Sequence, residues 1–188
     1  MTSIYYPTRF RLDHKDRYLI WHSSMNGEEP DGVVVNADGL MPVFRDGSSL
    51  FTYAAVEGLS PVDENQTGLH NLDSVVRWLE RKRPAELDCV EFLNAWNLFG
   101  DLSATVGGIF NPDGDKTHKI YGKLFWGCNL PSMTPPGKCY VPLWPGRESR
   151  IIREVMSEGL RLFRSRIWLQ REAAHSARAS GPADRMGV

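Results

Sequence analysis

Apolar residues recur at helical spacing over residues 88–106, and this pattern predicts a helix. Asp88 is placed to cap its N-terminus, Glu91 follows at the spacing of a capping box, and Gly107 is placed to end it. One side carries Cys89, Phe92, Leu93, Trp96 and Phe99, and the other carries Ala95, Leu98, Leu102 and Val106. A helix that is apolar nearly all round is a buried helix, so we expect it to cross the core.

A narrow polar row remains on this helix. Asn94, Asn97, Asp101 and Thr105 follow one another at steps of three and four residues, which places them along one edge. Such a row either satisfies buried neighbours or faces a partner, and the pattern alone leaves both interpretations open.

Three further segments have helical patterns. Residues 148–170 place an apolar face opposite a row of arginines, as in a standard amphipathic helix. Residues 72–83 repeat apolar side chains at helical spacing and end in a basic cluster. Residues 48–59 form the third segment, with Ser48 or Ser49 as the expected cap.

Strand patterns are shorter. Residues 18–22 are rich in β-forming side chains, and residues 118–125 are the other isolated strand candidate. Residues 33–35 and 40–44 flank a turn over residues 36–39 that contains Asp-Gly, a strong hairpin signal.

The segment 126–145 contains five prolines, so we expect it to be irregular. It is also apolar, which suggests a loop packed on the body of the protein. We therefore predict the α+β class, with one compact domain over residues 1–171. In it an N-terminal β-hairpin and short strands pack with about four helices, and residues 172–188 form a mobile tail.

The composition is that of an ordinary globular protein, with 188 residues of which 41% are hydrophobic and 24% charged. No apolar run approaches the roughly 18 to 20 residues that span a bilayer, and the first 24 residues lack the pattern of a secretory signal. Cys89, Cys128 and Cys139 form an odd set without paired spacing, which is typical of a reducing compartment. We expect a cytoplasmic protein that does not bind membranes.

The net charge of −1 hides an uneven distribution. Residues 26–101 contain 14 acidic and 5 basic side chains, whereas residues 147–188 contain nine arginines and five acids. The charge imbalance of each segment taken alone is explained by solvated helix faces and a loose tail. A field that steers a basic partner onto the acidic region explains them together. The expected partner-binding acids are Glu28, Glu29, Asp31, Asp63, Glu64, Asp73 and Asp101.

Catalytic and metal-binding motifs are missing from the sequence. The five histidines share no metal-ligand spacing with one another or with the cysteines, and no Walker lysine or GxSxG serine occurs. Acidic pairs stand in turn-rich loops, where solvated turn chemistry is the commoner explanation. The arginines after residue 147 are interrupted by acids and the pI is about 6.5, which disfavours direct nucleic-acid binding. We expect no enzyme activity, no cofactor and no metal.

Three sequence segments carry a family resemblance. FLNAWNLFGDL (residues 92–102), YGKLFWGCNLP (121–131) and YVPLWP (140–145) resemble small bacterial immunity proteins of polymorphic toxin systems, in particular those of contact-dependent growth inhibition. The preceding GLMPVFRDGSSLFTYA (39–54) is similar to them as well, and the likeness in layout extends over residues 17–167.

This resemblance implies a cytoplasmic protein that binds and blocks the toxic C-terminal domain of a cognate toxin, very often a nuclease. A basic toxin surface would suit the acidic region. Two alternatives remain. One is a small-molecule enzyme whose pocket lies beside helix 88–106, lined by its polar row and His118, and the other is a regulatory adaptor without enzyme activity.

Overall fold

A long β-hairpin opens the chain in the computed structural model, which describes residues 3–25, 27, 30–62, 68–81, 86–108, 110 and 114–169. Strand β1 (Ser3–Leu12) pairs antiparallel with β2 (Lys15–Ser24). The strand expected at residues 18–22 lies inside β2, whereas β1 was not predicted. Its signal was the alternation of Thr8, Phe10 and Leu12, which are buried, with arginines that are not.

The hairpin is the centre of a mixed sheet with the strand order β3-β2-β1-β5. Strand β3 (Gly32–Val33) runs antiparallel to β2, and β5 (Leu69–Asn71) runs parallel to β1. A second, two-stranded sheet joins β4 (Met41–Val43) in parallel to β6 (Ile167–Leu169), close to the described end of the chain.

The predicted hairpin over residues 33–44 is wrong in its pairing, although its turn forms. The Asn36 side chain accepts hydrogen bonds from the backbone N–H groups of Asp38 and Leu40, and Gly39 has a φ of +70°. The strands on either side then diverge, because β3 joins the hairpin sheet and β4 joins β6. Pairing with distant strands has replaced the local pairing.

The helices of the described residues are α1 (Gly47–Val56), α2 (Leu72–Glu80), α3 (Cys89–Val106), α4 (Asp115–Gly127) and α5 (Gly146–Arg166). The predicted cap of α1 is wrong, because Asp46 occupies that position and its side chain accepts a hydrogen bond from the Ser49 N–H at 2.8 Å. The structure confirms the α+β class.

Residues 118–125 were predicted as a strand, and this prediction is wrong. They lie inside α4, whose buried residues Ile120 and Leu124 stand one helical turn apart. Their large apolar side chains suit either element, so the short segment was ambiguous by itself.

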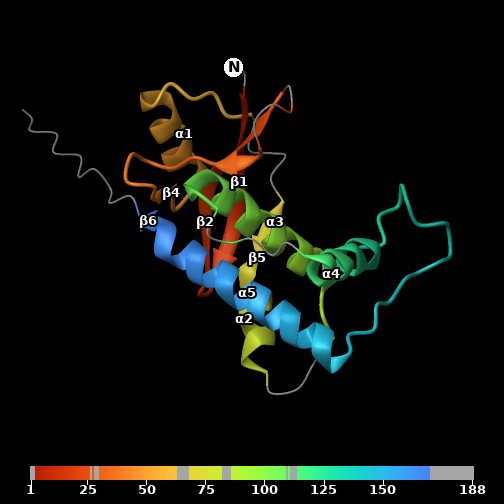
Figure 1. Cartoon of the computed structure of the whole chain (residues 1–188). Helices are drawn as coiled ribbons and strands as arrows, with labels where there is room; N and C mark the ends of the chain where they lie inside the picture. The colour runs from red at the N-terminus through yellow and green to blue at the C-terminus, as the bar shows by residue number, and fades with distance from the viewer. Residues whose placement is uncertain are drawn as a thin grey trace, which may run out of the picture.

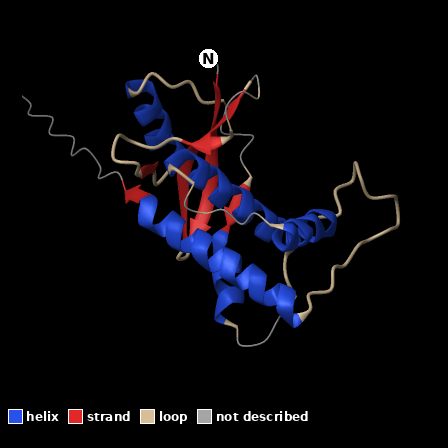
Figure 2. Cartoon of the chain, viewed as in Figure 1, coloured by secondary structure: helices blue, strands red, loops and turns tan. Residues whose placement is uncertain are grey.

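Helices cover both faces of the hairpin sheet unequally (Figures 1 and 2). Phe10 meets Phe163 of α5 edge-on at 5.1 Å between ring centroids, and the same face packs on α2 and α3. Leu19 joins this large core, whereas its neighbour Ile20 points the other way into a smaller cluster with Leu50 and Ala54 of α1. Helix α4 lies at the end of the molecule away from α1 (Figure 1).

Helix α3 occupies the middle of the large core, as its two-sided pattern predicted. Asp88 caps it by accepting hydrogen bonds from Val90 and Glu91, and Gly107 ends it in the left-handed conformation. Trp96 retains 6% of its surface exposure. In the described part of the chain, no helix combines the length and apolar character needed to cross a membrane.

Candidate protein-binding site

The predicted partner-binding acids do not form one surface in the described residues. Glu28, Glu29, Asp63 and Glu64 lie outside the residues that the structure describes. Asp31 is exposed just before β3. Asp73 and Asp101, treated next, have their carboxylates engaged inside the fold.

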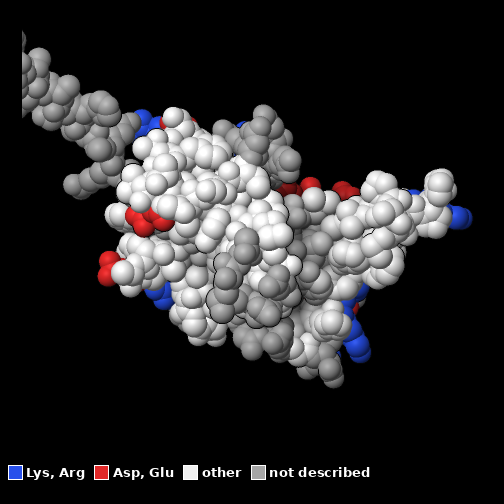
Figure 3. Space-filling view, turned by 90° about the horizontal axis from the view of Figure 1, so that it is seen from above, with Lys and Arg blue, Asp and Glu red and all other residues white. Residues whose placement is uncertain are grey.

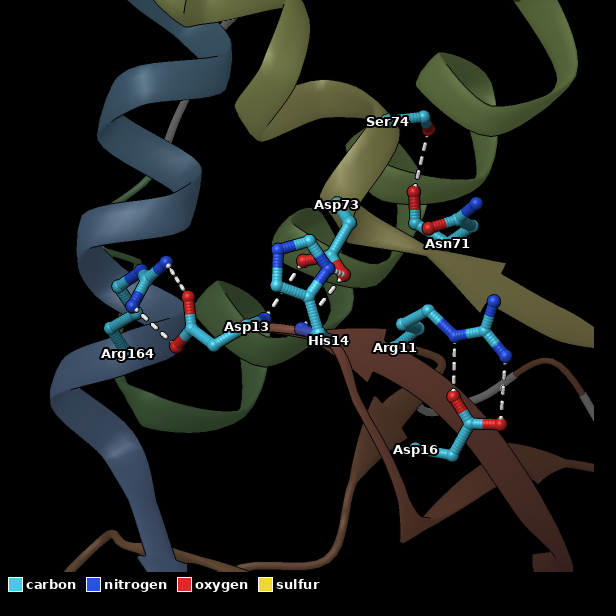
Figure 4. Close-up of polar contacts among 8 residues, drawn as sticks. All are labelled: Arg11, Asp13, His14, Asp16, Asn71, Asp73, Ser74 and Arg164. Carbon is cyan, nitrogen blue, oxygen red and sulfur yellow. Dashed lines mark hydrogen bonds and ion pairs between the residues drawn. The ribbon is translucent and has the colours of Figure 1, made fainter.

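Asp73 holds the turn of the long hairpin together (Figure 4). It is 4% exposed, and its two carboxylate oxygens accept the backbone N–H groups of Asp13 and His14 at 2.8 and 2.9 Å. Both turn residues have positive φ, which few residues other than glycine adopt readily. Asp73 therefore stabilises a strained turn, and we exclude it from the binding surface.

The same turn is tied to α5. Arg164 donates two hydrogen bonds to the Asp13 carboxylate at 2.7 and 2.8 Å, and Figure 4 shows the pair beside Asp73. This contact lowers the pKa of Asp13, chiefly through the hydrogen bond from Arg164. The cluster is a structural joint between the hairpin and the helices.

Asp101 connects α3 to the sheet. Its carboxylate accepts a hydrogen bond from Nε1 of Trp21 at 2.8 Å. Burial raises its pKa, the Trp21 bond opposes that rise, and the nearby Asp31 carboxylate adds to it. Asp101 thus fills a structural role, with Asp31 as its acidic neighbour at the surface.

Other members of the polar row on α3 also bond to neighbours. Thr105 accepts a hydrogen bond from Val33 N–H at 3.1 Å, and Asn97 accepts one from the Tyr121 hydroxyl at 2.9 Å. His118, which the enzyme interpretation placed in a pocket with this row, is exposed on α4. Asn97, Asp101 and Thr105 of the row therefore form hydrogen bonds with neighbouring elements.

The most unusual surface follows α4. We call residues 128–145 the binding loop. It stands out from the body beyond α4 (Figures 1 and 3). Its prolines keep it irregular, as predicted, and the expectation that it packs on the body holds for Trp144, which contacts the large core, but not for its exposed residues. Leu143 is 81% exposed and Val141 is 67% exposed, and the loop also exposes Leu130, Met133 and Tyr140.

This exposure is concentrated rather than scattered. Of the eleven large hydrophobic residues exposed in the described chain, five lie in the binding loop and a sixth, Trp126, precedes it by two residues. Single exposed apolar side chains are normal, whereas six within residues 126–143 are a concentration typical of an interaction site.

Asn129 closes the binding loop at its base. Its carboxamide accepts the Tyr140 N–H at 2.7 Å and donates to the Tyr140 carbonyl at 3.0 Å and to the Gly127 carbonyl at 2.9 Å. Asn129 has a φ of +49°, a conformation that asparagine tolerates better than most residues. The two ends of the loop are therefore held together, although the loop lacks a core of its own.

A second set of contacts anchors the returning limb. Lys123 of α4 donates to the Leu143 carbonyl and pairs with Glu148 of α5, and its ammonium lies 4.8 Å from the centre of the Trp144 ring. Ser149 donates to the Trp144 carbonyl at 3.1 Å. The limb is tied to α4 and α5 through its backbone, and it exposes Val141 and Leu143 while Trp144 packs on the core.

A cavity of about 440 Å³ lies beneath this limb. Leu87, Cys89 and Gly127 line it on the side of the body, and residues 140–144 line it on the side of the loop. A Cβ at Gly127 would overlap Sγ of Cys89, so glycine is required where α4 ends against α3. Among the described residues that line the cavity, Glu86 is the charged one.

The cysteines near the cavity are neutral at pH 7. Burial raises the pKa of the Cys89 thiol to about 11, with smaller contributions from Cys128 and from the Asp88 carboxylate. Burial also raises the pKa of Cys128. Cys139, near the far end of the loop, is exposed. No group of three or more His, Cys, Asp or Glu side chains is arranged to hold a metal ion within the described residues.

Comparison with known proteins adds one structural likeness. No protein-family profile matches the chain, and no curated protein is similar to it in sequence. The fold is similar to the crystal structure of the SatS C-terminal domain in complex with bromine, with 13% sequence identity and a TM-score of 0.48. The match covers 88% of this chain and 94% of that domain.

Proposed function

We propose that this chain is a protein-binding domain that neutralises a toxin domain and that the binding loop is its main contact surface. One observation carries the proposal: a fixed loop holds its large apolar side chains in solvent. Exposing Leu143 and Val141 keeps apolar surface in contact with water, which is unfavourable in the free protein. A partner that covers them would remove that cost.

The way the loop is held also suits binding. Asn129 and the five prolines of residues 126–145 restrict the loop before any partner arrives. A loop that is ordered in advance loses less conformational entropy on association, so more of the contact energy appears as affinity. Interfaces typically depend on a few apolar or aromatic anchors, and Leu143 and Tyr140 are suited to that role.

The toxin as partner comes from the sequence resemblance to immunity proteins, and charge is compatible with it. The acid-rich stretch 26–101 includes Glu86 and Asp88, both exposed beside the binding loop, and Asp31 at the sheet edge. A basic toxin domain would be attracted to these carboxylates during encounter, and the apolar loop would then supply the contact.

Co-expression tests the proposal. We expect a large toxin to be encoded immediately upstream, and its toxic C-terminal domain is expressed in cells with and without this chain. We expect the chain to restore growth and to co-purify with the domain in equal amounts. Co-purification without restored growth would favour the regulatory adaptor, and failure of both would refute the proposed function.

Charge reversal tests the contribution of the acidic region. Changing Asp31 to lysine, together with Glu28 and Glu29, should slow association and weaken its dependence on salt while the fold survives. Stopped-flow association at two ionic strengths measures both effects. Association at the wild-type rate at low ionic strength would contradict electrostatic steering by these acids. The loop contact would then be tested separately.

A further inference from the structure

The cavity under the binding loop has an apolar floor and one acidic wall. Leu87 and Cys89 form part of the floor, Val141 and Leu143 line the loop side, and Glu86 supplies the carboxylate. We propose that this cavity receives a basic side chain, arginine or lysine, from the partner protein. The inference rests on the proposed function for the source of that side chain.

Several groups around the cavity favour a cation. Glu86 lines it, whereas the Asp88 carboxylate two residues further on is engaged by the N–H groups at the cap of α3. Helix α4 ends at Gly127 on the cavity wall, and the C-terminal end of a helix carries partial negative charge. The N-terminus of α3 has the opposite sign, but Asp88 caps and offsets it.

Lys123 of α4 lies beside the cavity wall, and its charge is already paired within the chain. Lys123 pairs with Glu148 and donates to the Leu143 carbonyl, so its charge is offset by a carboxylate that does not line the cavity. The Lys123 ammonium lies over the Trp144 ring, so one face of the Trp144 indole already accepts a cation. Trp144 lines the cavity as well.

The apolar lining suits the rest of such a side chain. Arginine and lysine carry three or four methylene groups that pack on apolar surface while the charged head stays in a polar setting. Burial raises the pKa of Cys89 to about 11, so its thiol adds a neutral, weakly polar surface to the floor. A cavity of about 440 Å³ falls within the size range of pockets that take small ligands.

Small probes test this preference on the full chain without a partner. The ¹⁵N-labelled protein is titrated with the N-acetyl N-methylamides of arginine, of lysine and of citrulline, which is the neutral analogue of arginine. Backbone amide shifts of Cys89, Gly127 and Tyr140 report the cavity. We expect saturable shifts with the cationic probes and binding about fivefold weaker for citrulline, the factor expected for a partly exposed ion pair. The tighter of the two cationic probes identifies the preferred side chain.

Two matched variants locate the charge. Glu86→Gln should reduce the affinity for the arginine probe to that for citrulline. Glu57→Gln removes the same charge from an exposed position at the end of α1, on the other face of the sheet, and should leave the affinity unchanged. Equal affinities for arginine and citrulline, unchanged binding by Glu86→Gln, or the absence of saturable shifts would overturn the inference.

The outcome of these titrations does not depend on the outcome of the co-expression experiment. If the chain captures the toxin domain normally but binds none of the probes, only the inference that the cavity receives a basic side chain is overturned. Probe binding by a chain that captures no toxin domain would instead refute the proposed function and retain the preference of the cavity.

Discussion

The Asn129 carboxamide exchanges two hydrogen bonds with the backbone of Tyr140, at 2.7 and 3.0 Å, and so closes the binding loop. Asn129→Ala removes both bonds and should speed hydrogen exchange at the Tyr140 amide on the order of tenfold, the change expected from losing one net hydrogen bond. Because residues 130–141 of the loop lie outside both hydrophobic clusters, the melting temperature should hardly move. Exchange measured by NMR checks the first effect and calorimetry the second.

Asn97→Ala is the control for that experiment. Its side chain accepts a hydrogen bond from Tyr121, outside the binding loop. The Tyr140 amide should exchange as in the wild type. If both alanine variants leave the Tyr140 amide equally protected, the loop is held by something other than Asn129.

Gly159 allows α5 to approach α3 closely. A Cβ at this position would overlap the Phe99 ring, which is fully buried. Gly159→Ala should therefore destabilise the protein by about 1 to 3 kcal/mol, as overpacking does in other cores. Gly100→Ala, in α3, meets no atom within 4 Å and should be neutral or stabilising by about 0.5 to 1 kcal/mol. Urea unfolding measures both; similar free energies of unfolding for the two variants would show that the helices are not packed as described.

The three cysteines should react with iodoacetamide in a fixed order. Cys139 is exposed and should be alkylated first. Cys89 is buried and has a pKa of about 11, so little thiolate forms at pH 7.5 and it should react last. Mass spectrometry of peptides after timed quenching gives the order. Rapid modification of Cys89 in the folded chain would contradict its placement.

His70 should make stability depend on pH. Burial lowers its pKa below the usual value of 6.5, so the unfolded chain binds the proton more readily than the folded one. The contribution is therefore complete above about pH 6.5 and is lost as the pH falls towards the folded pKa. The free energy of unfolding should drop between pH 7.5 and 5.5 in the wild type, and less in His70→Gln. Parallel declines in the two proteins would assign the pH dependence to other groups.

The sequence predicted long amphipathic helices well and short elements poorly. Helix α3 was evident because its cap, its two-sided apolar pattern and its terminal glycine all agreed. The apolar face assigned to residues 148–170 is the buried face of α5, although β6 replaces the last turn. Residues 118–125 are few enough that helix and strand patterns cannot be separated without the neighbours they pack on.

The candidate site was only partly visible in the sequence. The prolines of 126–145 correctly predicted irregular structure, but an apolar loop is normally buried, and nothing local shows that Leu143 points into solvent. Asp73 and Asp101 looked like surface acids because their partners, the hairpin turn and Trp21, lie far away in sequence. Exposure is a property of the whole fold, which charge counts along the chain do not capture.

The most direct test of the account compares two aspartate substitutions at equally exposed apolar positions. Leu143 in the binding loop is 81% exposed and Val56 at the end of α1 is 80% exposed, so neither change should disturb the core. Affinity for the toxin domain identified by the co-expression experiment is measured by calorimetry, after circular dichroism has confirmed both folds. We predict that Leu143→Asp weakens binding by about thirtyfold or more, as loss of an interface anchor does, and that Val56→Asp binds like the wild type. Wild-type affinity in Leu143→Asp would contradict the binding loop as the contact surface.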